Sequence, residues 1–149
     1  CPSDMKENFV RGQEEAIKKL QGELDRSDEI DSFAELARLA ETLDMRISVT
    51  GELPGQTKLR DILAEAMREC LTNTIRHAEG SEVFLELNYG QDELKACITN
   101  NGNPPAGEIR ESGGLASLRR RIESFGGTMT TRGLPVFRLE IALPAREDG

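Results

Sequence analysis

The chain has 149 residues, enough for one domain with a sizeable core, and its 37% hydrophobic and 31% charged residues are typical of a globular domain with a wet surface. A formal net charge of -8, no Trp and a single Tyr argue against a nucleic-acid surface and against attraction to anionic membranes. No apolar run approaches the ~20 residues of a membrane span, so we expect no direct membrane contact.

The three cysteines, Cys1, Cys70 and Cys97, are an odd number and show no metal-ligand spacing. Cys70 and Cys97 fall in apolar helix and strand patterns, which predicts reduced thiols in the core of a cytosolic domain. A first residue other than Met suggests a fragment of a longer protein.

The first half of the chain is predicted to be mainly helical. Apolar spacing indicates an amphipathic helix over residues 5–25, and the segment "DRSDEIDS" ends it. A second helix is expected from a cap at Asp31 or Ser32 to about Leu43. The segment "RISVTGELPG" predicts a strand, and a long helix follows over residues 58–79, closed by the glycine after it.

The second half is predicted to contain two hairpins separated by a helix. The strands "EVFLELNYG" and "ELKACITN" form the first hairpin, and "TMTTRG" and "VFRLEIALP" form the second. Between them lie an irregular loop, "NGNPPAGEIRESGG", and a helix from Leu115 to Phe125. This order predicts an α+β fold, a two-layer sandwich with helices on one face of the sheet.

The long helix carries a polar group along one border of its apolar face. At ~100° per residue, Glu65, Glu69, Asn73 and Arg76 fall within roughly 80° of one another. One interpretation is that they merely pair along the helix, for about 0.2–0.5 kcal/mol each. The other is a magnesium nucleotide site, in which Asn73 offers a metal ligand, Glu69 orients a water and Arg76 meets phosphate.

Paired glycines, Gly113 and Gly114, stand where the irregular loop enters the next helix. Exposed backbone N–H groups at a helix start favour anions, and glycine lets phosphate oxygens approach closely. Glycines before a helix are common, so this signal becomes specific only together with the asparagine on the long helix.

These two segments resemble the ATP-binding domain of sensor histidine kinases in the GHKL (Bergerat-fold) superfamily. "EAMRECLTNTIRHAEGSEVFLEL" is similar to the N box of its "RHA" branch, and "SGGLASLRRRIESFGGTM" is similar to its second glycine box. The resemblance covers about residues 31–144 and implies a mixed, mainly antiparallel sheet, with ATP held between the N-box helix and a mobile lid. It divides the chain into an N-terminal helix or linker, 1–30, and an ATP-binding catalytic domain, 31–149.

The resemblance also implies roles for particular residues. Asn73 would hold magnesium, Arg76 and His77 would face phosphate or ribose, and the two glycines would hinge the lid. The implied ATP contacts are Asn73, Arg76, His77, Asn100, Gly102, Gly113, Gly114 and Leu115. Glu69 matches a water-polarising residue of the superfamily and is expected to position metal-bound water or the incoming histidine.

The box that reads adenine departs from the family pattern. Where the family has DxGxG, this chain has "NNGNP", with Asn100 in place of the aspartate that accepts a hydrogen bond from the adenine amino group. Asparagine keeps an oxygen acceptor, loses the charge and adds a donor, so we expect weaker discrimination against guanine. Pro104 replaces the second glycine and should stiffen the lid entrance. The later segment "RGLPVF" lacks the family's threonine contact.

The resemblance implies the catalytic piece of a two-component histidine kinase, and ATP and magnesium as cofactors. Its expected partners are an upstream helical dimerisation domain with the phosphoacceptor histidine and a response regulator, in a full-length homodimer. His77 is the only histidine and belongs to the N box, so we do not expect it to be the substrate. Residues 5–25 are either the end of the helical domain or a linker helix. The domain is expected to be cytoplasmic, in a protein that can be membrane-anchored.

Two alternatives remain at this stage. The altered adenine box fits a nucleotide-binding scaffold without kinase activity. The same fold also fits an anti-sigma-type serine kinase, which needs no histidine domain.

Overall fold

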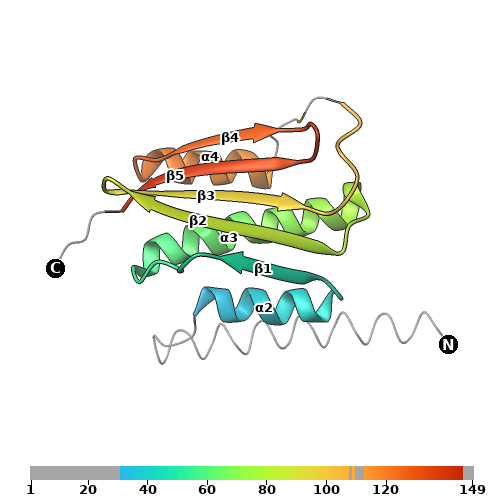
Figure 1. The fold of residues 1–149 in the computed structure, drawn as a ribbon, viewed down its shortest axis with the longest axis horizontal. Helices are drawn as coiled ribbons and strands as arrows, with labels where there is room; N and C mark the ends of the chain where they lie inside the picture. Colours follow the sequence, from blue (N-terminus) through green and yellow to red (C-terminus); the bar gives the residue numbers. More distant parts are fainter. Residues whose placement is uncertain (1–30, 108, 110–112, 146–149) are drawn as a thin grey trace.

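A computed structural model describes residues 31–107, 109 and 113–145, and the helix expected over 5–25 lies outside them. The described part is a two-layer sandwich, with a five-stranded sheet in front of α3 and α4 and with α2 beside the edge strand β1 (Figure 1). The helices are α2 (Ser32–Thr42), α3 (Thr57–Asn73) and α4 (Gly114–Ser124), and a π-helical turn, η1 (Thr74–Ala78), extends α3. The strands are β1 (Arg46–Thr50), β2 (Glu82–Gly90), β3 (Glu93–Asn100), β4 (Thr128–Arg132) and β5 (Arg138–Pro144).

The sheet has the order β1-β2-β3-β5-β4 and is mixed. β1 and β2 are parallel because α3 connects them, whereas the other neighbours are antiparallel. Both predicted hairpins and the predicted fold class are therefore confirmed. The last strand begins at Arg138, later than expected, because Arg132 pairs with Arg138 and residues 133–137 form the turn between β4 and β5.

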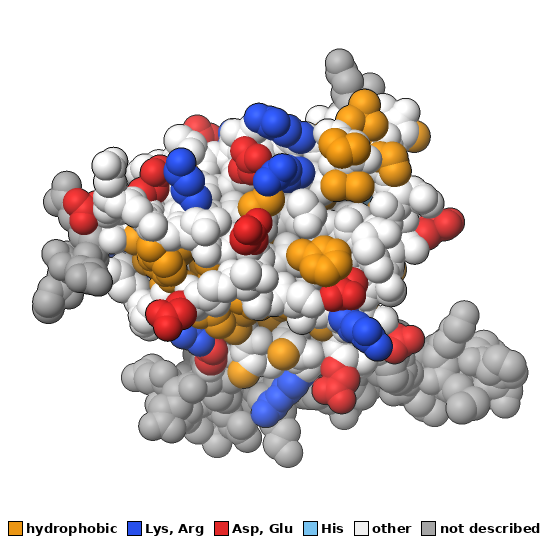
Figure 2. Space-filling view, in the orientation of Figure 1, with side chains coloured by type: hydrophobic (Ala, Val, Ile, Leu, Met, Phe, Trp, Pro, Cys, Tyr) orange, Lys and Arg blue, Asp and Glu red, His pale blue; other side chains and the backbone are white. Residues whose placement is uncertain are grey.

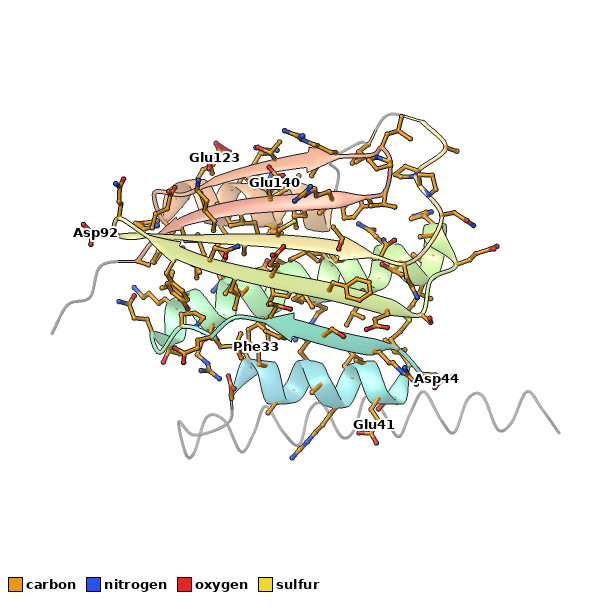
Figure 3. All side chains as sticks on the ribbon, viewed as in Figure 1. Phe33, Glu41, Asp44, Asp92, Glu123 and Glu140 are labelled. Carbon is orange, nitrogen blue, oxygen red and sulfur yellow. The ribbon has the colours of Figure 1, made fainter. Side chains whose placement is uncertain are left out.

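Strand alternation places the core between the sheet and the helices. On α3, Leu63, Met67 and Leu71 are at most 1% exposed and pack in the same cluster as the inward residues of β2, β3 and β5. Phe33 at the start of α2 points toward β1 (Figure 3) and is 8% exposed. Each such large side chain contributes about 1.5–3 kcal/mol, so the long helix is fixed firmly under the sheet. None of the helices in the described ranges is long and apolar enough to cross a membrane.

The ends of α2 and of the long helix lie where the sequence predicts them. Asp31 caps α2, with Oδ1 accepting from the Phe33 N–H at 3.2 Å. The helix expected over residues 58–79 is formed by α3 and η1 and ends at Ala78, but its last turn is π-helical, and Glu79 has a left-handed φ of 54°. The carbonyl of Ala78 accepts from the Asn103 N–H at 2.7 Å, so the turn is bonded to the loop after β3 instead of continuing an α-helix.

The face of the sheet turned away from the helices carries side chains of both charges, and Glu140 of β5 lies on it (Figures 2 and 3). Hydrophobic side chains gather at one end of this face, where the loop after β3 meets the β4–β5 turn (Figure 2). Cys97 lies half-exposed on this face, 3.0 Å from Nε of Arg138. The predicted core position is therefore confirmed for Cys70 but wrong for Cys97, which alternates with buried neighbours; Cys1 lies outside the described residues.

Candidate functional site

A cavity of about 560 Å³ opens where the end of α3, the end of β3 and the start of α4 meet. Its volume is within the ~300–1,000 Å³ typical of small-molecule sites. It gathers most of the residues singled out from the sequence. These are Glu69, Asn73, Arg76, His77, Asn100, Gly113, Gly114 and Leu115.

The polar side chains of α3 and η1 face this cavity without structural partners. Glu69 and Asn73 are half-buried, while Arg76 and His77 are exposed. Among the residues that the structure describes, none of these four side chains forms a hydrogen bond or ion pair. Pairing along the helix is therefore not what keeps them at the border of the buried face, and they are available to a ligand.

Glu65, the fourth member of the border group, has a different role. Its carboxylate forms an ion pair with Arg121 of α4 and so joins the two helices beside the cavity. Arg119 likewise donates to the backbone oxygen of Met129 at 2.7 Å. These two arginines hold α4 in place, and neither lines the cavity.

The glycine pair allows α4 to start directly against Glu69. A Cβ on Gly114 would lie 1.9 Å from the nearer carboxylate oxygen of Glu69, so no other residue fits while that carboxylate keeps its position. Gly113 has φ 58° and ψ -114°, a conformation that favours glycine. Among the described residues no side chain caps this helix, so its first N–H groups can bind an anion beside Glu69 and Asn73.

Asn100 ends β3 on the opposite side of the cavity and is only 5% exposed. Its Oδ1 accepts from the Gly102 N–H at 2.9 Å. Gly102 itself does not line the cavity, although a contact with ATP was expected. It packs against η1 instead, since a Cβ there would lie 2.5 Å from the Ala78 oxygen.

Sequence reasoning missed several lining residues: Thr72, Ala78, Asn103, Pro105, Ile109 and Phe137. Thr72 of the long helix is half-buried and reaches the cavity. Phe137 directly precedes β5, where Arg138 pairs with Thr99 of β3, so it reaches the cavity through a pairing of distant strands that the sequence does not show. The loop residues Pro105 and Ile109 carry no sequence signal either.

The donor set near Asn73 fits a magnesium ion bound mainly by phosphate and water. Within residues 31–107, 109 and 113–145, no group of three or more His, Cys, Asp or Glu side chains could hold a metal. Magnesium commonly takes only one or two protein oxygens and keeps the rest of its shell for water and phosphate. The unpartnered amide of Asn73 and carboxylate of Glu69 can supply such oxygens.

The chain resembles known proteins in sequence and in fold, although no family model matches it. It is 34% identical over 106 residues to the signal transduction histidine-protein kinase/phosphatase UhpB of Salmonella typhimurium, a match that covers 70% of this chain and 20% of that protein. It is 34% identical over 95 residues to the sensor protein VraS of Staphylococcus haemolyticus, covering 60% of this chain and 27% of that protein. The chain thus spans only a fifth to about a quarter of these relatives.

Solved structures agree on the fold. The ATP-binding domain of PrrB from Mycobacterium tuberculosis superposes with a TM-score of 0.55 at 22% identity, covering 79% of this chain and 96% of that domain. The histidine kinase domain of the blue-light activated kinase of Erythrobacter litoralis gives a TM-score of 0.58 at 16% identity, covering 77% of this chain and 65% of that chain. The sequence relatives show that the chain belongs to the sensor histidine kinase family, and the solved structures show that it has the fold of that family's ATP-binding domains.

Proposed function

We propose that the cavity between α3, β3 and α4 binds ATP with magnesium, and that the chain is the catalytic domain of a two-component histidine kinase. The observation that carries this proposal is the set of unpartnered polar side chains on α3 and η1, which faces an uncapped, glycine-started helix across one cavity. The relatives named as sensor kinases support the same activity.

Residues on the two sides of the cavity are proposed to bind different parts of the nucleotide. On the helix side, the Asn73 oxygen is offered to magnesium, and the guanidinium of Arg76 and the first N–H groups of α4 are offered to phosphate. On the strand side, Asn100 and the apolar Ile109 and Phe137 form a place for the base. Bound magnesium would neutralise phosphate charge, which phosphoryl transfer needs more than it needs covalent chemistry from the protein.

Glu69 is the proposed positioning residue. Its carboxylate lies close to the backbone of Gly114, at the boundary between the metal side and the glycine turn. From there it can accept a proton or a hydrogen bond from a water or an incoming imidazole beside the phosphate. His77, exposed on η1 at the cavity edge, is proposed to contact phosphate or ribose, not to receive the phosphoryl group.

The proposal extends to the partners that the chain itself does not contain. The acceptor histidine would belong to a helical dimerisation domain, and the phosphoryl group would pass to a response regulator. We place this domain in the cytoplasm, as part of a membrane-anchored homodimer. Residues 1–30, which lie outside the described part, are proposed to link the two domains.

The test is transfer of labelled phosphate from ATP to the helical domain, purified separately and added with magnesium. The expected product is an acid-labile, base-stable label that disappears when the acceptor histidine is replaced by glutamine. ATP binding without any transfer would contradict the kinase assignment and favour a scaffold. Acid-stable label on an added serine-bearing antagonist would instead identify a serine kinase.

A further inference from the structure

Asn100 is a buried polar residue whose side-chain amide forms a hydrogen bond through its oxygen but, among the described residues, not through its nitrogen. Its Oδ1 accepts from the Gly102 N–H at 2.9 Å, and a backbone N–H can only donate, so this bond fixes the orientation of the amide. The Nδ2 group therefore points away from Gly102. Among the described residues it has no hydrogen-bond partner, although the residue is only 5% exposed and lines the cavity.

The surroundings of Asn100 indicate that a flat, mostly apolar group binds beside it. Asn100 shares the inward face of β3 with Ile98, and Phe137, which directly precedes β5, is buried and lines the same cavity. Ile109 and Leu115 line the same cavity. The phosphate-binding features lie on the other side, on α3 and at the start of α4, so the base of a nucleotide is the part that would reach Asn100.

We propose that Asn100 reads the 6-position of a purine as a hydrogen-bond donor, so that the site accepts a 6-oxopurine nucleotide at least as well as ATP. This inference rests on the proposed nucleotide site. Guanine and hypoxanthine present an oxygen acceptor at position 6, which satisfies an Nδ2 donor, whereas adenine presents an amino group that would meet it donor to donor. A buried donor left without a partner weakens binding, which is why such contacts discriminate strongly between otherwise similar ligands.

Asn100→Asp is the matched variant. A carboxylate has nearly the same shape and can keep the bond from the Gly102 N–H with one oxygen, but its second oxygen is an acceptor. The substitution should therefore reverse the reading of position 6 and leave the loop intact. Thermal unfolding of both proteins checks that the loop and the core survive.

The experiment is calorimetric titration of wild type and Asn100→Asp with ATP and with inosine triphosphate, in magnesium. Inosine triphosphate carries the 6-oxo group without the 2-amino group of guanine, so it isolates the contact. We expect wild type to bind inosine triphosphate at least as tightly as ATP, and the ratio of the two affinities to shift toward ATP by about tenfold or more in the variant.

The possible failures can be told apart. A wild-type site that binds ATP tenfold more tightly than inosine triphosphate overturns this inference alone and leaves the nucleotide site standing. If neither nucleotide binds to wild type, both the proposed nucleotide site and the proposed contact between Asn100 and position 6 of the purine are contradicted. Should the variant not fold, the wild-type ratio decides by itself.

Discussion

Replacing Gly102 with alanine tests whether the loop after β3 is anchored to η1 as the structure shows. A Cβ at this position would lie 2.5 Å from the carbonyl oxygen of Ala78 and 2.6 Å from its Cβ, whereas ordinary contacts begin near 3.4 Å. Both obstacles belong to backbone or to a short side chain, so neither can rotate away. The loop and η1 must separate by about 1 Å to admit the methyl group.

Two hydrogen bonds depend on this close approach. The Gly102 N–H donates to Asn100 Oδ1 at 2.9 Å, and the Asn103 N–H donates to the Ala78 oxygen at 2.7 Å. Overpacking costs about 1–3 kcal/mol, and the two bonds, which are lengthened and not lost, together add about 1 kcal/mol, since a whole hydrogen bond contributes about 0.5–1.5 kcal/mol. We therefore expect Gly102→Ala to lower the free energy of unfolding by about 2–4 kcal/mol.

Gly55→Ala is the matched control. A Cβ at Gly55 meets nothing within 4 Å, and neither glycine has a φ in the region that excludes alanine. A compatible Gly→Ala change stabilises by about 0.4–1 kcal/mol through the unfolded chain. The two substitutions are thus chemically identical, and they differ only in what the methyl group meets.

The assay is urea and thermal unfolding followed by circular dichroism. For a domain of this size, a loss of 2–4 kcal/mol corresponds to a fall in Tm of about 4–16 °C. Nucleotide affinity should fall as well, because Asn100 loses the bond that orients it. A Gly102→Ala protein as stable as the Gly55→Ala control would refute the packing of the loop against η1.

Three further outcomes follow from the core, the cap and the cysteines. Leu63→Ala should lose about 2–5 kcal/mol of stability in urea unfolding, because Leu63 is fully buried; a loss below 1 kcal/mol would contradict its place in the core. The Arg60 guanidinium, which is hydrogen-bonded to Asp31, lowers the pKa of the Asp31 carboxyl below its ordinary value of 3.8. The pair of Asp31 and Arg60 therefore stabilises the fold above pH 3.8, and this stabilisation is lost as the pH falls through the lowered pKa. Asp31→Asn keeps a capping side chain and should be less stable than wild type by under about 1 kcal/mol at pH 7. In acid unfolding this deficit should shrink as the pH falls below 3.8 and vanish below the lowered pKa; a deficit independent of pH would count against the ion pair. In a Cys1→Ser protein, a thiol reagent should label half-exposed Cys97 and leave Cys70 unmodified, as measured by peptide mass spectrometry. Burial, and next the charge of Glu69, raises the pKa of the Cys70 thiol well above its usual value, so the reactive thiolate does not form. Equal labelling of both cysteines in the native state would show that Cys70 is accessible.

The helix side of the site could be predicted because its geometry is local. The helical period alone places Glu69 and Asn73 along one border of the apolar face, and the structure finds both half-buried at the cavity. The glycines that start α4 are equally readable, since glycine permits both the turn and the contact with Glu69. No property of the local sequence, however, shows that Glu65 pairs with α4 while Glu69 remains unpartnered.

The strand side depends on contacts between distant segments, which the local pattern does not contain. The π-helical turn forms where the Asn103 N–H reaches the Ala78 oxygen from the loop after β3, so the sequence predicted where the long helix ends but not the π-helical form of its last turn. Cys97 was assigned to the core from its apolar neighbours, although the pleat places it on the open face. Ile109 lines the cavity from the segment between β3 and α4, a position that the local pattern does not indicate.

Magnesium-dependent nucleotide binding at Asn73 is the central claim, and calorimetry of wild type and Asn73→Ala with ATP tests it most directly. Wild type should bind ATP more tightly with magnesium than with a chelator. The variant should lose that gain, about tenfold or more in affinity, while its binding without magnesium stays unchanged. An unaltered magnesium dependence in Asn73→Ala, or no heat of ATP binding to wild type, would contradict the account.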